Sequence, residues 1–218
     1  MGSLIFQNEA CLVINKLAGE SSEFFEFPNR AEKLFPVHRL DTPVSGCLLL
    51  ARNPKAAAFL SSAFAGQGKV EKCYWAVVEK PKNGLVIPNE AILVHWISED
   101  KKANKSFAFA EAGHGRKKAE LRCRLAGEGD NYFFLEIDLI TGRHHQIRAQ
   151  LAACGLHVKG DLKYGAKRSE KNGGIRLHAF SLGFPNPINP NETIDVKALP
   201  PVMDSLWTAY HKRIGRPY

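Results

Sequence analysis

Short segments in which apolar and polar residues alternate recur along the chain, and turn-forming residues separate them. The two clearest cover residues 117–125 and 131–140. An alternation of period two is typical of strands that bury one face. Further strands are expected at 4–6, 11–15, 47–51, 69–79, 92–97, 106–110 and 175–184. The pattern therefore predicts a protein built mainly on β-structure.

Helical patterns occupy three further segments. A helix is expected at 55–65, because Asn53 is a favourable N-cap residue and Pro54 fits the first turn, where its missing N–H costs nothing. The spacing of apolar residues indicates two more helices, at 147–154 and 198–212. Strands and helices are thus mixed along one chain.

The composition places the chain among globular proteins. Hydrophobic residues make up 44% and charged residues 24% of the 218 residues, so a disordered chain is not expected. This length suffices for one large domain or for two lobes with a substantial core. The 30 basic residues outnumber the 22 acidic ones, which gives a net charge of +8. Such an excess favours a polyanionic partner.

Neither a membrane segment nor a metal site is expected. No apolar run approaches the roughly 20 residues that cross a bilayer, and the N-terminus lacks a signal-peptide pattern, so the sequence predicts a cytoplasmic protein. The five cysteines are odd in number and widely spaced, which is typical of reduced core thiols. Because no Cys and His residues are paired at zinc-binding spacing, we expect no structural zinc.

One stretch has the layout of a site. His38, Arg39 and Asp41 come just before a turn that contains Pro43 and Gly46, and the turn leads into an apolar segment. A charged trio on a loop that a core strand fixes could carry chemistry. On layout alone, a surface imidazole beside a loop ion pair is an equally good interpretation.

A second informative stretch, Thr-Gly-Arg-His-His-Gln-Ile-Arg, covers residues 141–148. It joins a predicted strand to a predicted helix, which puts Arg143 at the mouth of the junction. By itself such a cluster of two arginines and two histidines is most often a solvated basic patch or a phosphate-binding spot.

Together these stretches resemble the motifs of the RluA-type pseudouridine synthases. His-Arg-Leu-Asp at 38–41, followed by Ser-Gly and an aliphatic run, resembles the first motif, although Val44 stands where the family usually has Thr. Residues 72–76 resemble the second motif, Lys-x-Tyr-x-Ala, and residues 141–148 resemble the third. Arg-Leu-His-Ala at 176–179 resembles the last. Long motifs in the right order, about 100 residues apart, are a strong signal.

The resemblance implies an α+β fold: a mixed, mainly antiparallel β-sheet in two lobes, flanked by a few helices, with a catalytic cleft across the sheet. Residues 1–218 are expected to form a single catalytic domain. The first strands and the Lys-x-x-Gly segment at 16–19 resemble the beginning of that domain. An accessory RNA-binding domain ahead of it is therefore expected to be absent.

The resemblance also implies the activity, which is the isomerisation of uridine to pseudouridine at specific sites in structured tRNA or rRNA. The bond between ribose and uracil N1 breaks, the base turns, and a bond to uracil C5 forms. This isomerisation involves no net oxidation or reduction, so no cofactor is expected. The family resemblance makes Asp41 the catalytic residue. Whether its carboxylate attacks the sugar or stabilises charge while a glycal forms stays open.

Two further residues receive catalytic roles. We expect Arg143 to pair with Asp41, because a neighbouring guanidinium keeps a carboxylate ionised in a cleft. The resemblance to the second motif makes Tyr74 the residue that faces the target base. It would stack on the uracil and take the proton from C5, whereas a mid-strand tyrosine is otherwise most often a packed aromatic.

RNA is the expected partner, with no membrane and no obligate protein partner. Arg39 is expected to hold a phosphate or to fill the stack that a flipped base vacates. Leu177 would pack against the reacting nucleotide. His145 and Arg148 are further candidates for substrate binding, although His145 could instead brace its motif. A phosphate track could also include Lys159, Lys163, Lys167 and Arg168.

Two other classes of function would fit parts of the sequence. A hydrolase that depends on aspartate would need a metal-binding carboxylate cluster or a paired acid and base, and neither is evident near Asp41. A catalytically silent RNA-binding module would keep the basic surface and tolerate loss of Asp41. The presence of Asp41, Tyr74 and Arg143 together argues against the silent module.

Overall fold

A computed structural model describes residues 2–23, 33–66, 68–81, 88–170 and 172–214. The chain divides into two compact units. The first consists of Met1–Lys72 with His178–Pro201, and the second consists of Cys73–Leu177 with Val202–Tyr218. Each unit is therefore built from two segments that are distant in the sequence.

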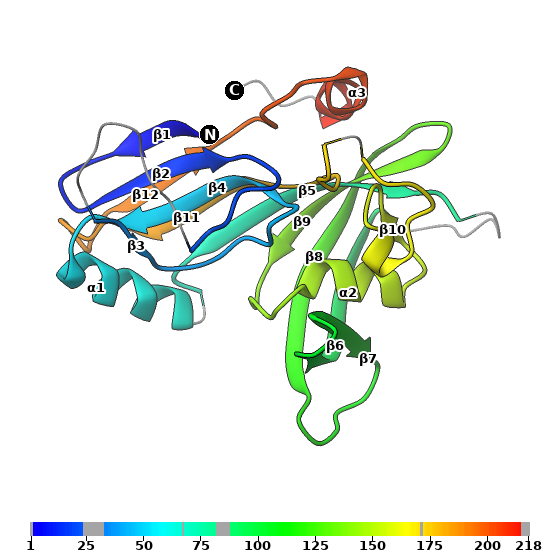
Figure 1. The fold of residues 1–218 in the computed structure, drawn as a ribbon, viewed down its shortest axis with the longest axis horizontal. Coiled ribbons are helices and arrows are strands. Elements are labelled where there is room, and N and C mark those ends of the chain that lie inside the picture. The colour runs from blue at the N-terminus through cyan, green and yellow to red at the C-terminus, as the bar shows by residue number, and fades with distance from the viewer. Residues whose placement is uncertain (1, 24–32, 67, 82–87, 171, 215–218) are drawn as a thin grey trace. The chain divides into compact units, whose positions relative to one another are not determined.

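The first unit is organised around a mostly antiparallel sheet (Figure 1). Its strands follow the order β1 (Ser3–Gln7), β2 (Cys11–Lys16), β4 (Ser45–Ala51) and β11 (Leu177–Pro185). Strands β4 and β11 are parallel, and they pair at Ser45 and Gly46. The short strand β3 (Phe35–Pro36) extends β4, and β12 (Thr193–Lys197) forms an antiparallel pair with β11.

Helix α1 (Pro54–Ala65) covers one face of this sheet (Figure 1). Leu60 of the helix packs into a cluster with Val13, Leu49 and Phe184, all of them fully buried. The Asn53 side chain accepts a hydrogen bond from the Ala56 N–H at 2.9 Å. The predicted cap and the predicted helix are thus both confirmed.

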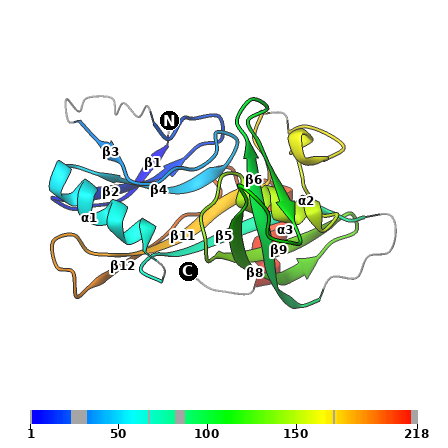
Figure 2. The same cartoon turned by 90° about the horizontal axis from the view of Figure 1, so that it is seen from below.

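The second unit contains an antiparallel sheet (Figure 2). Its order is β5 (Glu71–Glu79), β9 (Tyr132–Leu139), β8 (Lys117–Glu128), β6 (Glu90–Asp100) and β7 (Lys105–Phe109). The two-residue strand β10 (His157–Val158) pairs with β5, and the 3-10 turn η1 (Leu162–Tyr164) follows it. The alternation at 117–125 and 131–140 does correspond to strands, β8 and β9.

Two helices pack on this second sheet. Helix α2 (Gln146–Ala153) lies against β6 and β7, and Ile147 and Leu151 are buried there. Helix α3 (Ser205–Ile214) packs Tyr210 against Trp75 of β5, with 4.8 Å between the ring centroids. The Tyr210 hydroxyl donates to the Leu135 carbonyl at 2.8 Å, which satisfies the only polar atom of a buried ring.

Most predicted elements are confirmed, but the C-terminal helix was predicted to start too early. It was expected from residue 198 and begins at Ser205. Pro200 and Pro201 cannot donate within a helix, and Asp204 instead accepts from the Trp207 N–H at 3.1 Å, as an N-cap does. Strand β12 was not predicted, because its apolar residues are too few to reveal the alternation.

The cysteines lack disulfides, as expected, and three of the five are buried. Burial raises the pKa of Cys11 to about 11 and that of Cys47 to about 12, so both stay protonated as core thiols. No helix among the described residues is long and apolar enough to cross a bilayer.

The α1 cap gives a direct test of this fold. Replacing Asn53 with Ala removes the acceptor for the Ala56 N–H and should lower the free energy of unfolding by about 1 kcal/mol. Urea denaturation measures the change. Asn53→Asp, which keeps an acceptor oxygen, should lie within a few tenths of a kcal/mol of wild type. Equal loss in both variants would contradict a capping role.

Candidate functional site: two fixed loops

Asp41 lies in a tight turn just before β4. The Val44 N–H donates to the Asp41 carbonyl at 2.9 Å, which closes the turn. Leu40 and Val44 on either side are buried, while Asp41 itself is partly exposed. The turn is thus anchored by apolar side chains at both ends, with the carboxylate between them.

Two polar side chains also hold the backbone of this turn. The buried Ser22 hydroxyl donates to the Leu40 carbonyl at 2.8 Å and accepts from the Leu40 N–H at 3.0 Å. Lys16 Nζ donates to the carbonyls of Leu17 and Glu20 at 2.9 Å and to that of Thr42 at 3.3 Å. The residues immediately before and after Asp41 are therefore both fixed.

Lys16 is a fully buried cation. Burial lowers its pKa to about 8, and the carboxylates of Glu20 and Asp41 oppose that shift. An ammonium group with its three donors engaged can be accommodated in a core, although removing it from water is costly. Its position ties the end of β2 electrostatically to the turn that carries Asp41.

His38 is a structural residue in this unit. Its Nε2 accepts from the Leu49 N–H at 2.9 Å, and its ring stacks on Phe64 with 4.5 Å between centroids. Burial of the ring and the nearby charge of Lys72 lower its pKa to about 3. The imidazole is neutral, as an acceptor at Nε2 requires, and it links the loop to the middle of β4.

His178 performs a similar task on β11. Its Nδ1 accepts from the Ser45 hydroxyl at 2.9 Å, and its Nε2 donates to the Ala198 carbonyl at 2.8 Å. Burial lowers its pKa to about 4. At the neighbouring Gly46 a Cβ would lie 2.3 Å from the Ala179 carbonyl oxygen, so only glycine permits the two strands to approach.

In the second unit, Tyr74 lies mid-strand on β5 as predicted. It is buried, pairs with Ile137 of β9 and shares a face with Ala76 and Val78. Strand β5, from which the Tyr74 phenol projects, pairs with both β9 and β10.

Arg143 lies in the turn between β9 and α2, and Gln146 shapes this turn. The Gln146 side-chain oxygen accepts from the Arg143 N–H at 2.9 Å and from the Thr141 hydroxyl at 2.8 Å. Its amide group donates to the Glu120 carbonyl at 3.1 Å. Arg143 Nε donates to the Lys118 carbonyl at 3.1 Å, so the exposed guanidinium is held at a fixed point.

His145 is buried and braces the same turn. It has a left-handed backbone (φ 52°) at the start of α2, and its Nδ1 lies 3.0 Å from the Tyr164 hydroxyl. That hydroxyl also accepts from the Ser106 N–H at 2.8 Å. The His144 ring stacks on His145 and reaches the Ser106 hydroxyl at 2.9 Å. Edge strand β7 is thereby tied to the third motif.

Arg148 has an internal partner. Its guanidinium makes two hydrogen bonds to Asp161, at 2.7 and 2.9 Å, and both side chains are buried. It also lies over the Tyr164 ring, 4.8 Å from the centroid. Contact of Arg148 or His145 with RNA therefore stays a prediction, while the structure gives both residues a bracing role.

The remaining predicted residues differ in exposure. Arg39 is exposed and lies 3.2 Å from the exposed Glu23 carboxylate, a surface ion pair that contributes little to stability. Leu177 is buried at the start of β11. Asp41 belongs to the first unit, and Tyr74 and Arg143 belong to the second. The predicted pairing of Asp41 with Arg143 therefore stays a prediction.

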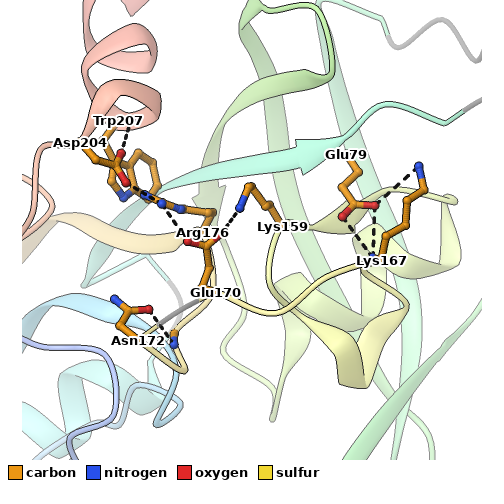
Figure 3. A network of polar contacts seen from close by, with 9 residues as sticks. Glu79, Lys159, Lys167, Glu170, Asn172, Arg176, Asp204 and Trp207 are labelled. Carbon is orange, nitrogen blue, oxygen red and sulfur yellow. Dashed lines mark hydrogen bonds and ion pairs between the residues drawn. The ribbon is translucent and has the colours of Figure 1, made fainter.

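A polar network surrounds Arg176, the residue before Leu177 (Figure 3). The Arg176 guanidinium donates to Glu170 at 2.8 Å and to Asp204 at 2.6 Å, and Lys159 pairs with the same Glu170. The Arg176 backbone donates to the Lys159 carbonyl and accepts from Val77 of β5, both at 2.9 Å. Arg176, just before β11, is thereby fixed to the strand that carries Tyr74.

Sequence comparison identifies the family. Residues 12–153 match the family model described as RNA pseudouridylate synthase. The chain belongs to this family. The match covers the turn of Asp41, strand β5 with Tyr74 and the turn of Arg143, which are the places where the RluA-type motifs were recognised.

Individual relatives bear names of the same family, and a solved structure shares the fold. An uncharacterized RNA pseudouridine synthase of Zymomonas mobilis is 37% identical over 67% of this chain and 64% of its own length. The tRNA pseudouridine synthase C of Haemophilus ducreyi is 28% identical over 97% of this chain and 95% of its own. The human RNA pseudouridylate synthase domain containing 1 shares the fold, with a TM-score of 0.72, 23% identity and coverage of 100% and 96%.

These comparisons confirm the predicted family and the α+β fold of the synthases. The aligned region spans 47–64% of the length of three curated relatives that the chain matches. Within the described ranges, no group of three or more Cys, His, Asp or Glu side chains could hold a metal ion.

Several positioning residues in this chain escaped sequence analysis. Lys16 was noted only as part of a Lys-x-x-Gly segment, and its burial could not be foreseen because lysines are almost never fully buried. Ser22 and Gln146 bond to main-chain groups of the two loops. Such bonds depend on the folded backbone, so residue type alone could not reveal them.

The two neutral histidines predict a pH dependence of stability. An unfolded histidine titrates near 6.5, whereas His38 and His178 in the folded protein titrate at about 3 and about 4. The unfolded state therefore binds more protons between about pH 6.5 and 4, and the free energy of unfolding should fall as the pH is lowered through this window. Each histidine contributes up to about 1.4 kcal/mol per pH unit.

Urea denaturation between pH 4.5 and 7.5 measures this dependence. His178→Gln removes one of the two titrating groups. The unfolding free energy of this variant should therefore depend less steeply on pH than that of wild type, by up to about 1.4 kcal/mol per pH unit, which corresponds to one proton. Identical slopes would mean that His178 is not buried in its neutral form.

The Arg148–Asp161 pair gives a second prediction. Asp161→Asn leaves a buried guanidinium without its counter-charge and should cost about 3–5 kcal/mol of unfolding free energy. The double variant Arg148→Met with Asp161→Leu should recover most of that loss, because no charge remains buried. If the double variant also lowered the slope of log K against log salt for RNA by about 0.7–0.9, Arg148 would be a phosphate contact after all.

Proposed function

We propose that this chain is an RNA pseudouridine synthase, which isomerises uridine to pseudouridine at specific positions in folded RNA. The observation that carries the proposal is the family match over residues 12–153, because it includes all three segments that would supply the catalytic groups. The net charge of +8 supports a polyanionic substrate.

The reaction conserves every atom. The bond between ribose C1′ and uracil N1 breaks, the uracil rotates while it stays bound, and C1′ is joined to uracil C5. The proton on C5 leaves, and N1 gains one. Because the reaction is a rearrangement, the residues of the chain need to stabilise charge, hold the detached base and move a proton, and we propose no cofactor.

We assign Asp41 the role of the carboxylate that acts at C1′. It either forms a bond to the sugar or stabilises positive charge on it while a glycal forms. Fixing of Leu40 by Ser22 and of Thr42 by Lys16 supports this assignment, because a reacting group must be held in place before the substrate arrives.

Arg143 is proposed as the counter-charge that keeps the catalytic carboxylate ionised. The Gln146 bond to its backbone and the Lys118 carbonyl at its Nε support a fixed position for the guanidinium. Tyr74 is proposed to stack on the uracil and to receive the C5 proton. Leu177 would pack against the same nucleotide.

The substrate is proposed to be tRNA or rRNA with an extruded target base. Flipping costs a few kcal/mol and is easiest in loops. Arg39, on its exposed loop beside Asp41, would contact a phosphate or fill the vacated stack. We favour tRNA as the first RNA to test, since the relative that aligns over 97% of this chain bears the name of a tRNA pseudouridine synthase.

Tritium release tests the activity. RNA from a strain that lacks this gene, labelled with tritium at uracil C5, should lose tritium to water when the wild-type protein is added. Asp41→Asn, which keeps the size of the side chain, should reduce the rate by at least about a thousandfold, as expected when a nucleophile or charge-stabilising group is lost. Mapping the modified nucleotide then identifies the RNA.

The same assay separates the other two roles. Tyr74→Phe should release little tritium yet still bind RNA, and Arg143→Lys should lose most activity, because one ammonium cannot replace a planar guanidinium. If neither wild type nor Asp41→Asn released tritium while both bound RNA with the same salt dependence, the chain would be a binding module and the proposed activity would be wrong.

A further inference from the structure

One face of the sheet in the second unit carries an unusual set of exposed apolar side chains. The register opposes Trp96 of β6 to Phe109 of β7 and to Lys118 of β8. Phe107 lies opposite Ser98, two residues away from the first pair on each strand, so it belongs to the same face of the sheet. We call this surface the aromatic face; its apolar members are Ile92, Val94, Trp96, Phe107 and Phe109.

The exposure of this face is high. Ile92 is 56% exposed, Phe107 44% and Val94 38%. A single exposed hydrophobic residue is ordinary on a protein surface, but several on adjacent strands of one sheet face mark an interaction site. None of these residues belongs to the four recognised motifs, so the catalytic proposal does not account for them.

Cations accompany the aromatic rings at one end of the face. Lys105 Nζ lies 5.5 Å from the centroid of the Phe107 ring, and it also lies 5.2 Å from that of Tyr164. The Arg116 guanidinium stacks on Phe109 at 3.6 Å. Among the described residues, neither Lys105 nor Arg116 has a carboxylate within ion-pair distance. Exposed Lys101 and Lys102 in the adjoining turn add further positive charge.

The other end of the face is different. There Arg122 pairs with Glu90 at 3.4 Å, and in the middle of the face Lys118, opposite Trp96, pairs with Glu120 at 3.1 Å. Ile92 lies directly opposite Arg122 and Val94 opposite Glu120, so the aliphatic residues stand among balanced charges. At the end formed by β7, Lys101, Lys102, Lys105 and Arg116 therefore outnumber the acidic residues Glu99, Asp100 and Glu111, and this excess of positive charge coincides with the aromatic rings.

We propose that the β7 end of the aromatic face binds an unpaired segment of the substrate RNA, with a base stacked on Phe107 and flanking phosphates held by Lys105 and the neighbouring cations. An exposed ring beside cations matches the two chemical features of a single strand, its flat bases and its phosphates. A second copy of this chain would bring like charges together at this end, which disfavours self-association.

This inference rests on the proposed function, because it takes the substrate RNA as the ligand. It goes beyond that function by assigning a contact surface on β7 that lies outside every catalytic motif. The bases bound there would be unpaired, since stacking on a protein ring needs an accessible base face.

The test compares variants of the full chain in RNA binding and in tritium release. Phe107→Leu keeps an apolar side chain but removes the ring, and Lys105→Gln removes the cation. Each should weaken RNA binding and raise KM by about tenfold while kcat at saturating RNA stays unchanged. Lys105→Gln should also reduce the slope of log K against log salt by about 0.7.

Two variants serve as controls. Phe107→Tyr keeps a ring for stacking and should behave as wild type. Ile92→Ser changes an exposed apolar residue at the charge-balanced end and should leave RNA affinity unchanged. Wild-type affinity and KM in Phe107→Leu would overturn the inference. So would a shift from dimer to monomer in sedimentation for both Phe107→Leu and Ile92→Ser, since the face would then bind a second copy.

The two proposals fail in different ways. If wild type releases no tritium yet Phe107→Leu still weakens RNA binding, the proposed activity is wrong and the RNA-binding face stands. If tritium release is normal and depends on Asp41 but is insensitive to Phe107, the activity stands and the aromatic face is not an RNA-binding surface.

Discussion

The first unit depends on a buried ammonium group. Lys16 Nζ donates to three carbonyls, and one of them belongs to Thr42, next to Asp41. A cation without water must find acceptors, so the chain around it has little freedom to move. Because the buried charge needs these acceptors, it fixes the position of the loop that supplies them. Apolar packing by Leu40 and Val44 alone would leave the backbone direction less closely defined.

The second unit fixes its loop with neutral groups instead. Gln146 bonds to the main chain of the Arg143 turn, and the Tyr164 hydroxyl joins His145 to the edge strand. Amides and hydroxyls cost less to bury than charges, provided that their partners are all present. The buried guanidinium of Arg148 has its counter-charge beside it in Asp161. Both units thus hold a predicted site residue, Asp41 or Arg143, on a backbone that buried polar side chains restrain.

The sequence predicted local elements and the family, but it did not predict the long-range contacts of buried side chains. Alternation located β8 and β9, and Asn53 with Pro54 located α1, because these signals act over a few neighbouring residues. The motifs identified the family. The neutral forms of His38 and His178 could not be foreseen, since they arise from burial and from bonds to distant backbone. Arg148 was predicted to bind substrate, and its bonds to Asp161 could not be foreseen, because the sequence does not show that the two side chains lie together.

The parallel pairing of β4 with β11 has a consequence for how the chain acquires its structure. The bond between Ser45 and His178 closes a loop of 133 residues, and Ala198, which completes that contact, comes later still. Contacts so distant in sequence form slowly. During synthesis the second unit has emerged almost entirely before the last strands of the first exist. The segment that carries Asp41 therefore waits, incompletely supported, until nearly the whole protein has been made.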